Sequence, residues 1–307
     1  MASIVYEAKQ LADRLRKEMA DRKISNQTYR QYKDRVVKFA IWCRERYGCR
    51  HIEECPAHLQ DYSDWLAAQG YSPNTVHKYL AGASRVFGVP LDSISKPRRV
   101  VADNTRSRGV KAVDSRSDAQ REASPRLYDF ALAVGIRRNE YKHLCGNDLV
   151  VDESGYPCVR VRRGKGGKYQ EQRIAPKDVG FVRSFFDGSE GRIFSDEEMK
   201  NKIDLHHLRA LRAQRVYHDY LARLKSDPDY RAQLTEEVRR RWVRLCSKRW
   251  DPNCVEGNYC IRGNSRRLAL AHGLPVKYDR LAVMAVSIFH LSHWRCDVTV
   301  ANYLLAV

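Results

Sequence analysis

The feature that most constrains this chain is a break in its apolar pattern about a third of the way along. Regularly spaced apolar residues occur before and after residues 93–124, but within that stretch they disappear. We therefore predict a linker at 93–124 that joins two domains. The length of 307 residues, with 43% hydrophobic residues, is enough for two cores.

The first part of the predicted linker is dominated by Lys96, Arg98, Arg99, Arg106, Arg108 and Lys111. Two interpretations of this basic segment stay open. It is a disordered tether, or it crosses the phosphates of a DNA duplex, where each cationic contact releases counterions. Both hold if the segment is disordered in solution and ordered on DNA.

The segment before the linker has a helical pattern. Residues 1–22 mix Leu11 and Leu15 with many charges, which predicts a solvated N-terminal helix or arm. In residues 25–47 apolar side chains recur at steps of three and four, with Ser25 placed to cap the helix and Gly48 to end it. Further helical patterns lie at 56–70 and 72–87. We predict a small helical domain at 23–92, and a generic helical module is the simplest alternative.

The second predicted domain, residues 125–307, begins with an apolar helical pattern that ends at Gly135. Three short segments rich in β-branched residues follow, separated by turn residues. These predicted strands are 149–151, 159–161 and 172–174. Helical patterns make up most of the remainder. The predicted fold class is mainly α with a small antiparallel β-sheet, an α+β arrangement.

The charge of the chain indicates its class of partner. The formal net charge is +19 and the pI is about 9.6, which favours a polyanion. We expect double-stranded DNA and no membrane, because no apolar run is long enough to span a bilayer. The start of the chain lacks the pattern of a secretory signal, so the expected location is cytoplasmic, associated with the nucleoid.

The nine cysteines show no C-x-x-C pair, which favours free thiols in a reducing compartment. Cys246, Cys254 and Cys260, with His272 nearby, do not match the usual zinc spacing, so we expect no metal. We expect no cofactor either.

Five groups of residues that could act on a phosphate follow one another in the second domain. They are Arg137 in GIRRNE, Lys165 in GKGGK, His206 with Arg209 in HHLR, His293 in LSH, and Tyr303. Alone, each has an ordinary explanation: a double arginine is usually surface charge, GKGGK reads as a β-hairpin turn, and a terminal tyrosine usually covers a core edge. The order of the set is much more specific than any member.

This order of arginine, lysine, His-x-x-Arg, histidine and tyrosine resembles the tyrosine recombinase (phage integrase) family, in a context similar to integrases of mobile elements and conjugative transposons. The resemblance covers roughly residues 25–307. It implies a helical core-binding domain that grips DNA, followed by a catalytic domain at 125–307. In that family the tyrosine attacks DNA and forms a 3′-phosphotyrosyl bond.

The resemblance also implies a role for each residue. Arg137 and Arg209 would clamp the phosphate through their planar guanidinium groups. Lys165, with Lys168 as the fallback, would protonate the 5′ leaving oxygen. His206 would take or hold the tyrosine proton, because an unperturbed histidine titrates near neutrality. His293 would hydrogen-bond the phosphate or pack beneath it.

Three features depart from the family pattern. Ser292 stands where the family has glycine. About eighty residues separate Arg209 from His293, so residues 225–276 look like an insertion that contacts DNA or a partner. The chain also continues only four residues beyond Tyr303, so a family-type docking tail between protomers would have to be supplied otherwise.

The predicted function is therefore site-specific DNA recombination, with DNA integration as its typical form. The expected partners are DNA, further copies of this chain in a tetramer on paired sites, and an accessory DNA-bending or excision factor. The predicted DNA-binding residues are Lys33, Lys78, Arg85, Arg98, Arg99, Arg106, Arg108 and Lys168. Two alternatives remain: relaxation of DNA in the manner of a type IB topoisomerase, and DNA binding by a regulator without catalysis.

Overall fold

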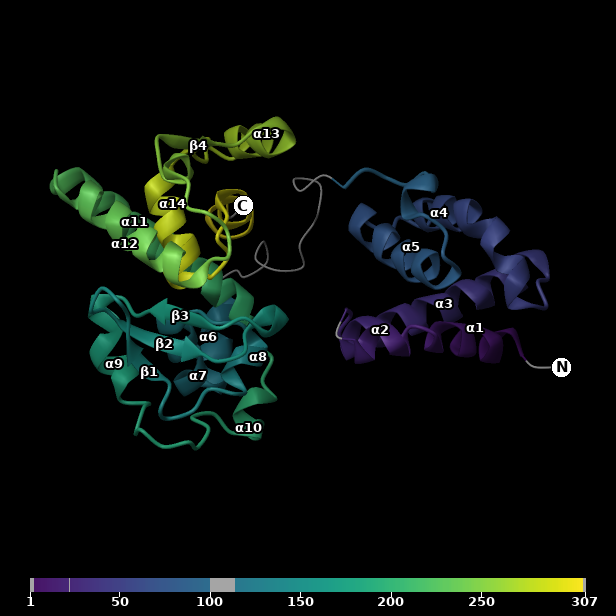
Figure 1. The fold of residues 1–307 in the computed structure, drawn as a ribbon, viewed down its shortest axis with the longest axis horizontal. Coiled ribbons are helices and arrows are strands. Elements are labelled where there is room, and N and C mark those ends of the chain that lie inside the picture. The colour runs from purple at the N-terminus through teal and green to yellow at the C-terminus, as the bar shows by residue number, and fades with distance from the viewer. Residues whose placement is uncertain (1–2, 22, 100–113, 306–307) are drawn as a thin grey trace. The chain divides into compact units, whose positions relative to one another are not determined.

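The chain forms two compact units, Met1–Thr105 and Arg106–Val307, each of which is described by itself. The structure is a computed structural model that describes residues 3–21, 23–99 and 114–305 (Figure 1). Arg106, Arg108 and Lys111 of the predicted linker therefore lie outside the described residues. Within the described part, no helix is both long enough and apolar enough to cross a bilayer.

The first unit is entirely helical. Its helices are α1 (Ile4–Asp13), α2 (Arg16–Ala20), α3 (Asn26–Tyr47), α4 (Leu59–Ala68) and α5 (Pro73–Phe87), with 3-10 turns at Ile52–His58 and Leu91–Ser93. Helix α3 begins and ends as its sequence predicts: the Ser25 side chain accepts a hydrogen bond from the Thr28 amide at 3.0 Å, and Gly48 has a left-handed φ of 72°.

Helix α1 belongs to the core of the first unit, whereas the sequence led us to expect a solvated helix or arm. Ile4, Ala8 and Ala12 are buried, and the first two join the core cluster that contains Val36 and Phe39 of α3. The small side chains of Ala8 and Ala12 allow the two helices to approach closely. Two of the three buried residues are alanines, and the many charged residues of this segment concealed an apolar face at helical spacing.

The second unit has the predicted three-stranded antiparallel sheet. Its strands, β1 (Leu149–Val151), β2 (Pro157–Val161) and β3 (Gln170–Arg173), pair in the order β1-β2-β3. The helices before and after this sheet are α6 (Asp114–Ala123), α7 (Pro125–Val134), α8 (Arg138–Tyr141), α9 (Val179–Arg183), α10 (Asp196–Met199) and α11 (Leu205–Ser226). The mainly α fold with a small antiparallel sheet is thus confirmed.

The last part of the second unit has the predicted helical character and adds two short strands that the sequence did not predict. It contains α12 (Tyr230–Leu245), β4 (Asn258–Cys260), α13 (Gly263–Ala271), β5 (Lys277–Asp279), α14 (Arg280–Ala285) and α15 (Cys296–Thr299). Strands β4 and β5 form a second antiparallel sheet. Two π-helical turns, Val286–His290 and Val300–Leu304, continue α14 and α15.

The predicted linker is shorter in the structure than its sequence suggested. Residues up to Arg99 belong to the first unit, where the Ser95 carbonyl accepts a hydrogen bond from Ser63 at 2.7 Å. At the other end α6 is helical, and the Gln120 side chain accepts from the Asp204 amide at 3.0 Å. Helix α6 is almost entirely polar, which explains why apolar periodicity could not reveal it.

The predicted insertion at 225–276 includes a structural helix. In α12 the buried Leu234, Val238 and Trp242 pack in one cluster with Met284 and Phe289. The same helix carries buried charges that bind the sheet. Arg173 donates to Glu237 and to Asp152, both at 2.6 Å, and Arg241 donates to Asp152 at 2.6 Å. Helix α12 is therefore bound to the sheet and is no detached appendage.

Removing one partner from this buried network should destabilise the protein strongly. Replacing Glu237 with leucine leaves the Arg173 guanidinium without one of its two carboxylates, at a cost of about 3–5 kcal/mol. Urea denaturation should show a large fall in the unfolding midpoint for Glu237→Leu. The adjacent Glu236→Leu is the matched control, because Glu236 is exposed and its pairs with Arg239 and Arg240 lie at the surface. Equal midpoints for both variants would contradict a structural role for the network.

Candidate active site

The last π-helical turn carries Tyr303, whose side chain is 3% exposed. The Leu305 amide donates to the Val300 carbonyl at 2.8 Å, the wider spacing of a π turn. The Tyr303 ring lies between two histidines, with ring centroids 5.3 Å from His206 and 5.2 Å from His293. Its hydroxyl is hydrogen-bonded to Nε2 of His293 at 3.0 Å.

His293 lies in a tightly held loop after α14. Its amide donates to the Ser287 carbonyl at 2.9 Å, and the Ser287 hydroxyl accepts from the Arg295 amide at 3.0 Å. The residues on either side, Ser292 and Trp294, have positive φ angles of 50° and 60°. Ser292 thus adopts the left-handed conformation that a glycine takes most easily. The loop accepts serine at the position of the expected glycine.

Burial lowers the pKa of His293 to about 3. Nearby positive charge adds to the effect, and the residues responsible are Arg209, Arg137, His206 and Lys165. His293 is consequently neutral at neutral pH and a weak base, so its ring can accept a hydrogen bond from the Tyr303 hydroxyl. The charges of these four residues act on the imidazole, and Tyr303 is hydrogen-bonded to it.

Arg209 is the most deeply buried of the predicted site residues. It lies one turn after His206 on α11 and is 1% exposed. Its Cζ lies 5.7 Å from the centre of the Tyr303 ring. The guanidinium donates to the carbonyls of Gly135 and Leu291, the second at 2.6 Å, while its Nε has no partner. Within the described residues it forms no ion pair with a carboxylate.

A buried cation without a counter-charge is costly, and burial lowers the pKa of Arg209, with Arg137 adding to the effect. The other two fully buried arginines of the unit differ, since Arg241 lies within 2.6 Å of Asp152 and Arg212 within 3.6 Å of Asp178. The position of Arg209 therefore suits an anion that is bound from outside the chain.

Arg137 stands immediately before α8 and is partly exposed. Glu140, one turn later, accepts from the Arg137 amide at 2.7 Å and from its guanidinium at 2.8 Å. Gly135 ends α7 with a φ of 68°, and a side chain there would lie 2.7 Å from Arg212. The glycine, arginine and glutamate of the sequence motif thus each have a structural reason for their spacing.

Gln170 connects several parts of the site, although no sequence pattern pointed to it. Its side chain accepts from Arg137 at 3.4 Å and donates to Glu140 at 3.3 Å. A side chain at Gly164 would lie 1.5 Å from the Gln170 amide nitrogen, so this glycine leaves room for it. Gln170 therefore contacts both Arg137 and the turn that carries Lys165.

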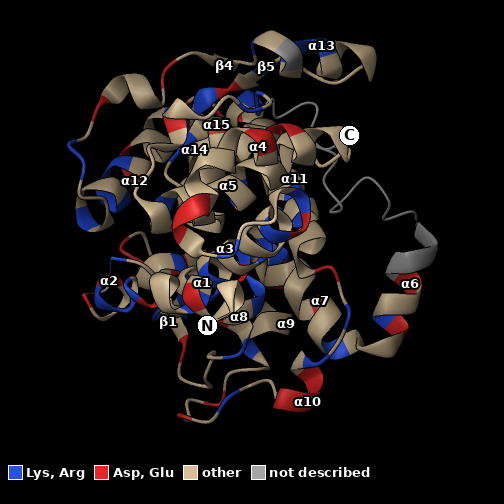
Figure 2. Cartoon of the chain, turned by 90° about the vertical axis from the view of Figure 1, so that its right-hand side faces the viewer, with Lys and Arg blue, Asp and Glu red and all other residues tan. Residues whose placement is uncertain are grey.

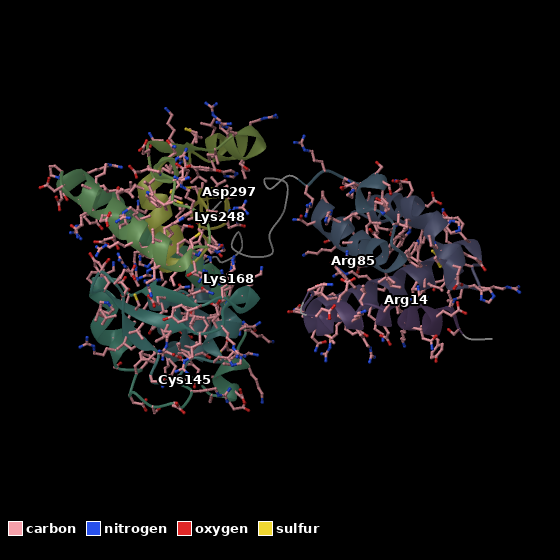
Figure 3. All side chains as sticks on the ribbon, in the orientation of Figure 1. Arg14, Arg85, Cys145, Lys168, Lys248 and Asp297 are labelled. Atoms are coloured by element: carbon pink, nitrogen blue, oxygen red, sulfur yellow. The ribbon has the colours of Figure 1, made fainter. Side chains whose placement is uncertain are left out.

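The two lysines of the Lys165–Gly167 turn region are both exposed, and Lys168, which follows the turn, is labelled in Figure 3. Exposure suits residues that reach toward a ligand in solvent. Neither lysine forms an ion pair within the described part of the chain. Lys165 is near enough to His293 to lower its pKa.

The predicted DNA-binding residues of the first unit fall into two groups. Lys33 and Arg85 each pair with a carboxylate, with Asp13 and Glu18 respectively, both at 2.6 Å; Arg85 is labelled in Figure 3. The remaining described members are exposed, namely Lys78, Arg98 and Arg99. The first two residues would have to exchange their carboxylate for phosphate in order to bind DNA.

Comparison with known proteins adds little. No family model matches the sequence, and no curated protein matches it. Among solved structures the chain is similar to a crystal structure of XerA recombinase, with 18% identity over 68% of this chain and 85% of that one. The TM-score is 0.26, too low to establish a shared fold, so the likeness is a weak one.

The strained backbone at Ser292 can be tested without touching the reactive groups. Ser292→Gly relieves the strain of the left-handed conformation but raises the conformational entropy of the unfolded chain. The two effects oppose each other, so the unfolding free energy of this variant should stay within about 1 kcal/mol of the original. Ser292→Val forces a β-branched residue into the same φ and should lower it by at least about 1–2 kcal/mol. Urea denaturation measures both. Equal stability of the glycine and valine variants would contradict the strained geometry.

Proposed function

We propose that this chain is a DNA strand-exchange enzyme, a tyrosine recombinase of the kind encoded by mobile elements, with Tyr303 as its nucleophile. The observation that carries the proposal is the buried Arg209, which pairs with no carboxylate among the described residues and lies beside a tyrosine that is hydrogen-bonded to a neutral histidine. A phosphodiester supplies the missing negative charge, and the tyrosine is the group that can attack it.

In the proposed first step, the DNA phosphate binds between Arg137 and Arg209, which stabilise the charge that develops on its oxygens. The phenol oxygen of Tyr303 attacks phosphorus, and the bond from phosphorus to the 5′ oxygen breaks. The phenol proton passes to a histidine. His206 takes this proton, the role that the resemblance gives it, while His293, whose pKa is too low for a base, orients the hydroxyl through the 3.0 Å hydrogen bond.

The leaving 5′ oxygen needs a proton, and Lys165 on its exposed turn is the donor in this proposal. The products are a 3′-phosphotyrosyl bond and a free 5′-hydroxyl. A 5′-hydroxyl from a second duplex then attacks the phosphotyrosine, which releases Tyr303 and joins the strands. The covalent bond conserves the energy of the broken one, so the cycle balances without ATP or metal.

Strand exchange brings two duplexes together, so the proposal includes a tetramer of this chain on paired sites. The exposed Lys78, Arg98, Arg99 and Lys168 would contribute contacts to the phosphate backbone. Arg106 and Arg108 belong to the same proposal, although they lie outside the described residues. An accessory DNA-bending or excision factor is the further expected partner.

The proposal predicts a covalent protein–DNA adduct that depends on one hydroxyl group. Nicked DNA that carries the target site should become covalently linked to the protein, and Tyr303→Phe should abolish the link. Tyr278→Phe is the matched control, because Tyr278 is buried in the same apolar cluster and its hydroxyl has no partner. The assay is denaturing gel electrophoresis of labelled DNA.

No adduct with the unmodified chain, or an adduct that survives Tyr303→Phe, would overturn the proposal. Tight binding without any adduct would indicate a regulator instead. Relaxation of a plasmid that lacks the target site would indicate topoisomerase activity.

A second prediction concerns the anion site. Arg209→Ala should slow adduct formation by at least about a hundredfold, the loss that follows removal of one preorganised donor to a transition-state oxyanion. Arg215→Ala, later on the same helix, is the control, because Arg215 pairs with Asp178 and is not assigned a role in the site. Circular dichroism should show that both variants remain folded. A near-normal rate for Arg209→Ala would remove Arg209 from the phosphate site.

A further inference from the structure

A basic arm extends from the second unit, formed by β4, α13 and β5. In Figure 1, α13 stands at the edge of this unit, well away from the β1-β2-β3 sheet. The sequence contains no Asp or Glu between residues 257 and 278. Figure 2 shows basic and no acidic residues along α13. The exposed cationic side chains of the arm are Arg262, Arg266, Arg267 and Lys277.

These cations differ from exposed arginines of α12, several of which have acidic partners. On α12 the side chain of Arg239 contacts Glu236 at 2.7 Å, and Arg244 contacts Glu153 at 2.8 Å. On the arm, none of the four cations forms an ion pair within the described residues. Uncompensated like charges repel one another and are relieved when phosphates approach.

The underside of the arm is fixed to the turn that carries the proposed nucleophile. Ile261 and Ala269 are buried in the same apolar cluster as Val300 and Tyr303. The strand pair of β4 and β5 closes the base of the arm, with Tyr259 paired to Tyr278. The arm therefore holds its charges at a constant position relative to Tyr303, and DNA bound at that tyrosine extends beyond it.

We propose that this arm is a second contact with the DNA duplex, where its arginines bind backbone phosphates away from the cleaved one. The inference rests on the proposed function, because it takes the DNA bound at Tyr303 as its partner. Helix α13 has nine residues and is about 13 Å long, which spans several phosphates of a duplex. Its one large exposed apolar side chain, Leu270, is too little for a membrane surface.

The test is the salt dependence of DNA binding by the full chain. The double variant Arg266→Ala/Arg267→Ala should lower the slope of log affinity against log salt by about 2, since each phosphate contact contributes about 0.9. Affinity should fall on any duplex sequence. The matched control is Arg239→Ala/Arg240→Ala, an adjacent arginine pair on α12 that already has Glu236 as its partner. Fluorescence anisotropy with a labelled duplex measures both variants.

A slope for the arm variant within about 0.5 of the original would overturn the inference, as would an equal fall in the control, which would reflect net charge alone. At saturating DNA the arm variant should form the covalent adduct at the normal rate, because its arginines do not touch the cleaved phosphate. A slower adduct under those conditions would also overturn a purely binding role. If the unmodified chain forms no adduct, the proposed function is wrong. The salt dependence of DNA binding then still tests, on its own, whether the arm contacts DNA.

Discussion

Four consecutive polar side chains are buried on one short strand, β3. The arrangement around the proposed site depends on the hydrogen bonds and ion pairs that these side chains form. Successive side chains of a strand point to opposite faces. On one face Gln170 contacts Arg137 and Glu140, and Gln172 donates to Gln170 at 3.2 Å. On the other face, Glu171 and Arg173 join the charges of α12. A buried polar group without a partner is costly, so each face requires the elements that satisfy it.

Helix α12 supports the proposed site from two directions as a result. Charged side chains of α12 form ion pairs with β3, as Glu237 does with Arg173. The indole ring of Trp242 packs edge-on against Trp294, with ring centroids 5.7 Å apart. Trp294 follows His293 in the loop with positive φ angles. The segment that the sequence suggested as an insertion for DNA or a partner thus divides into two parts. Its helix packs against the histidine loop, and the arm that follows is the part that we propose contacts DNA.

The sequence predicted what local patterns encode. Alternation and turn residues located the three strands, and Ser25 and Gly48 located the ends of α3, because these signals act within a few residues. Gln170 could not be found in this way, since a glutamine in a strand normally faces solvent, and its burial and its contacts with Arg137, Glu140 and Gly164 come from residues distant in the sequence. The left-handed conformation of Ser292 is imposed by the surrounding loop, and no local preference of serine predicts it.

The geometry also explains why the proposed nucleophile is buried before any DNA is bound. Arg209 lies against the Tyr303 ring and holds the carbonyls of Gly135 and Leu291, so it fixes the start of the Arg137 motif and the start of the His293 loop together. A guanidinium with two such bonds keeps its remaining N–H groups at fixed positions, which suits the phosphate in the proposed reaction. In that proposal the same residue organises the site and supplies part of its charge. These two roles would explain why an arginine is buried here without a carboxylate partner among the described residues, since burying an unpaired charge is unfavourable for folding alone.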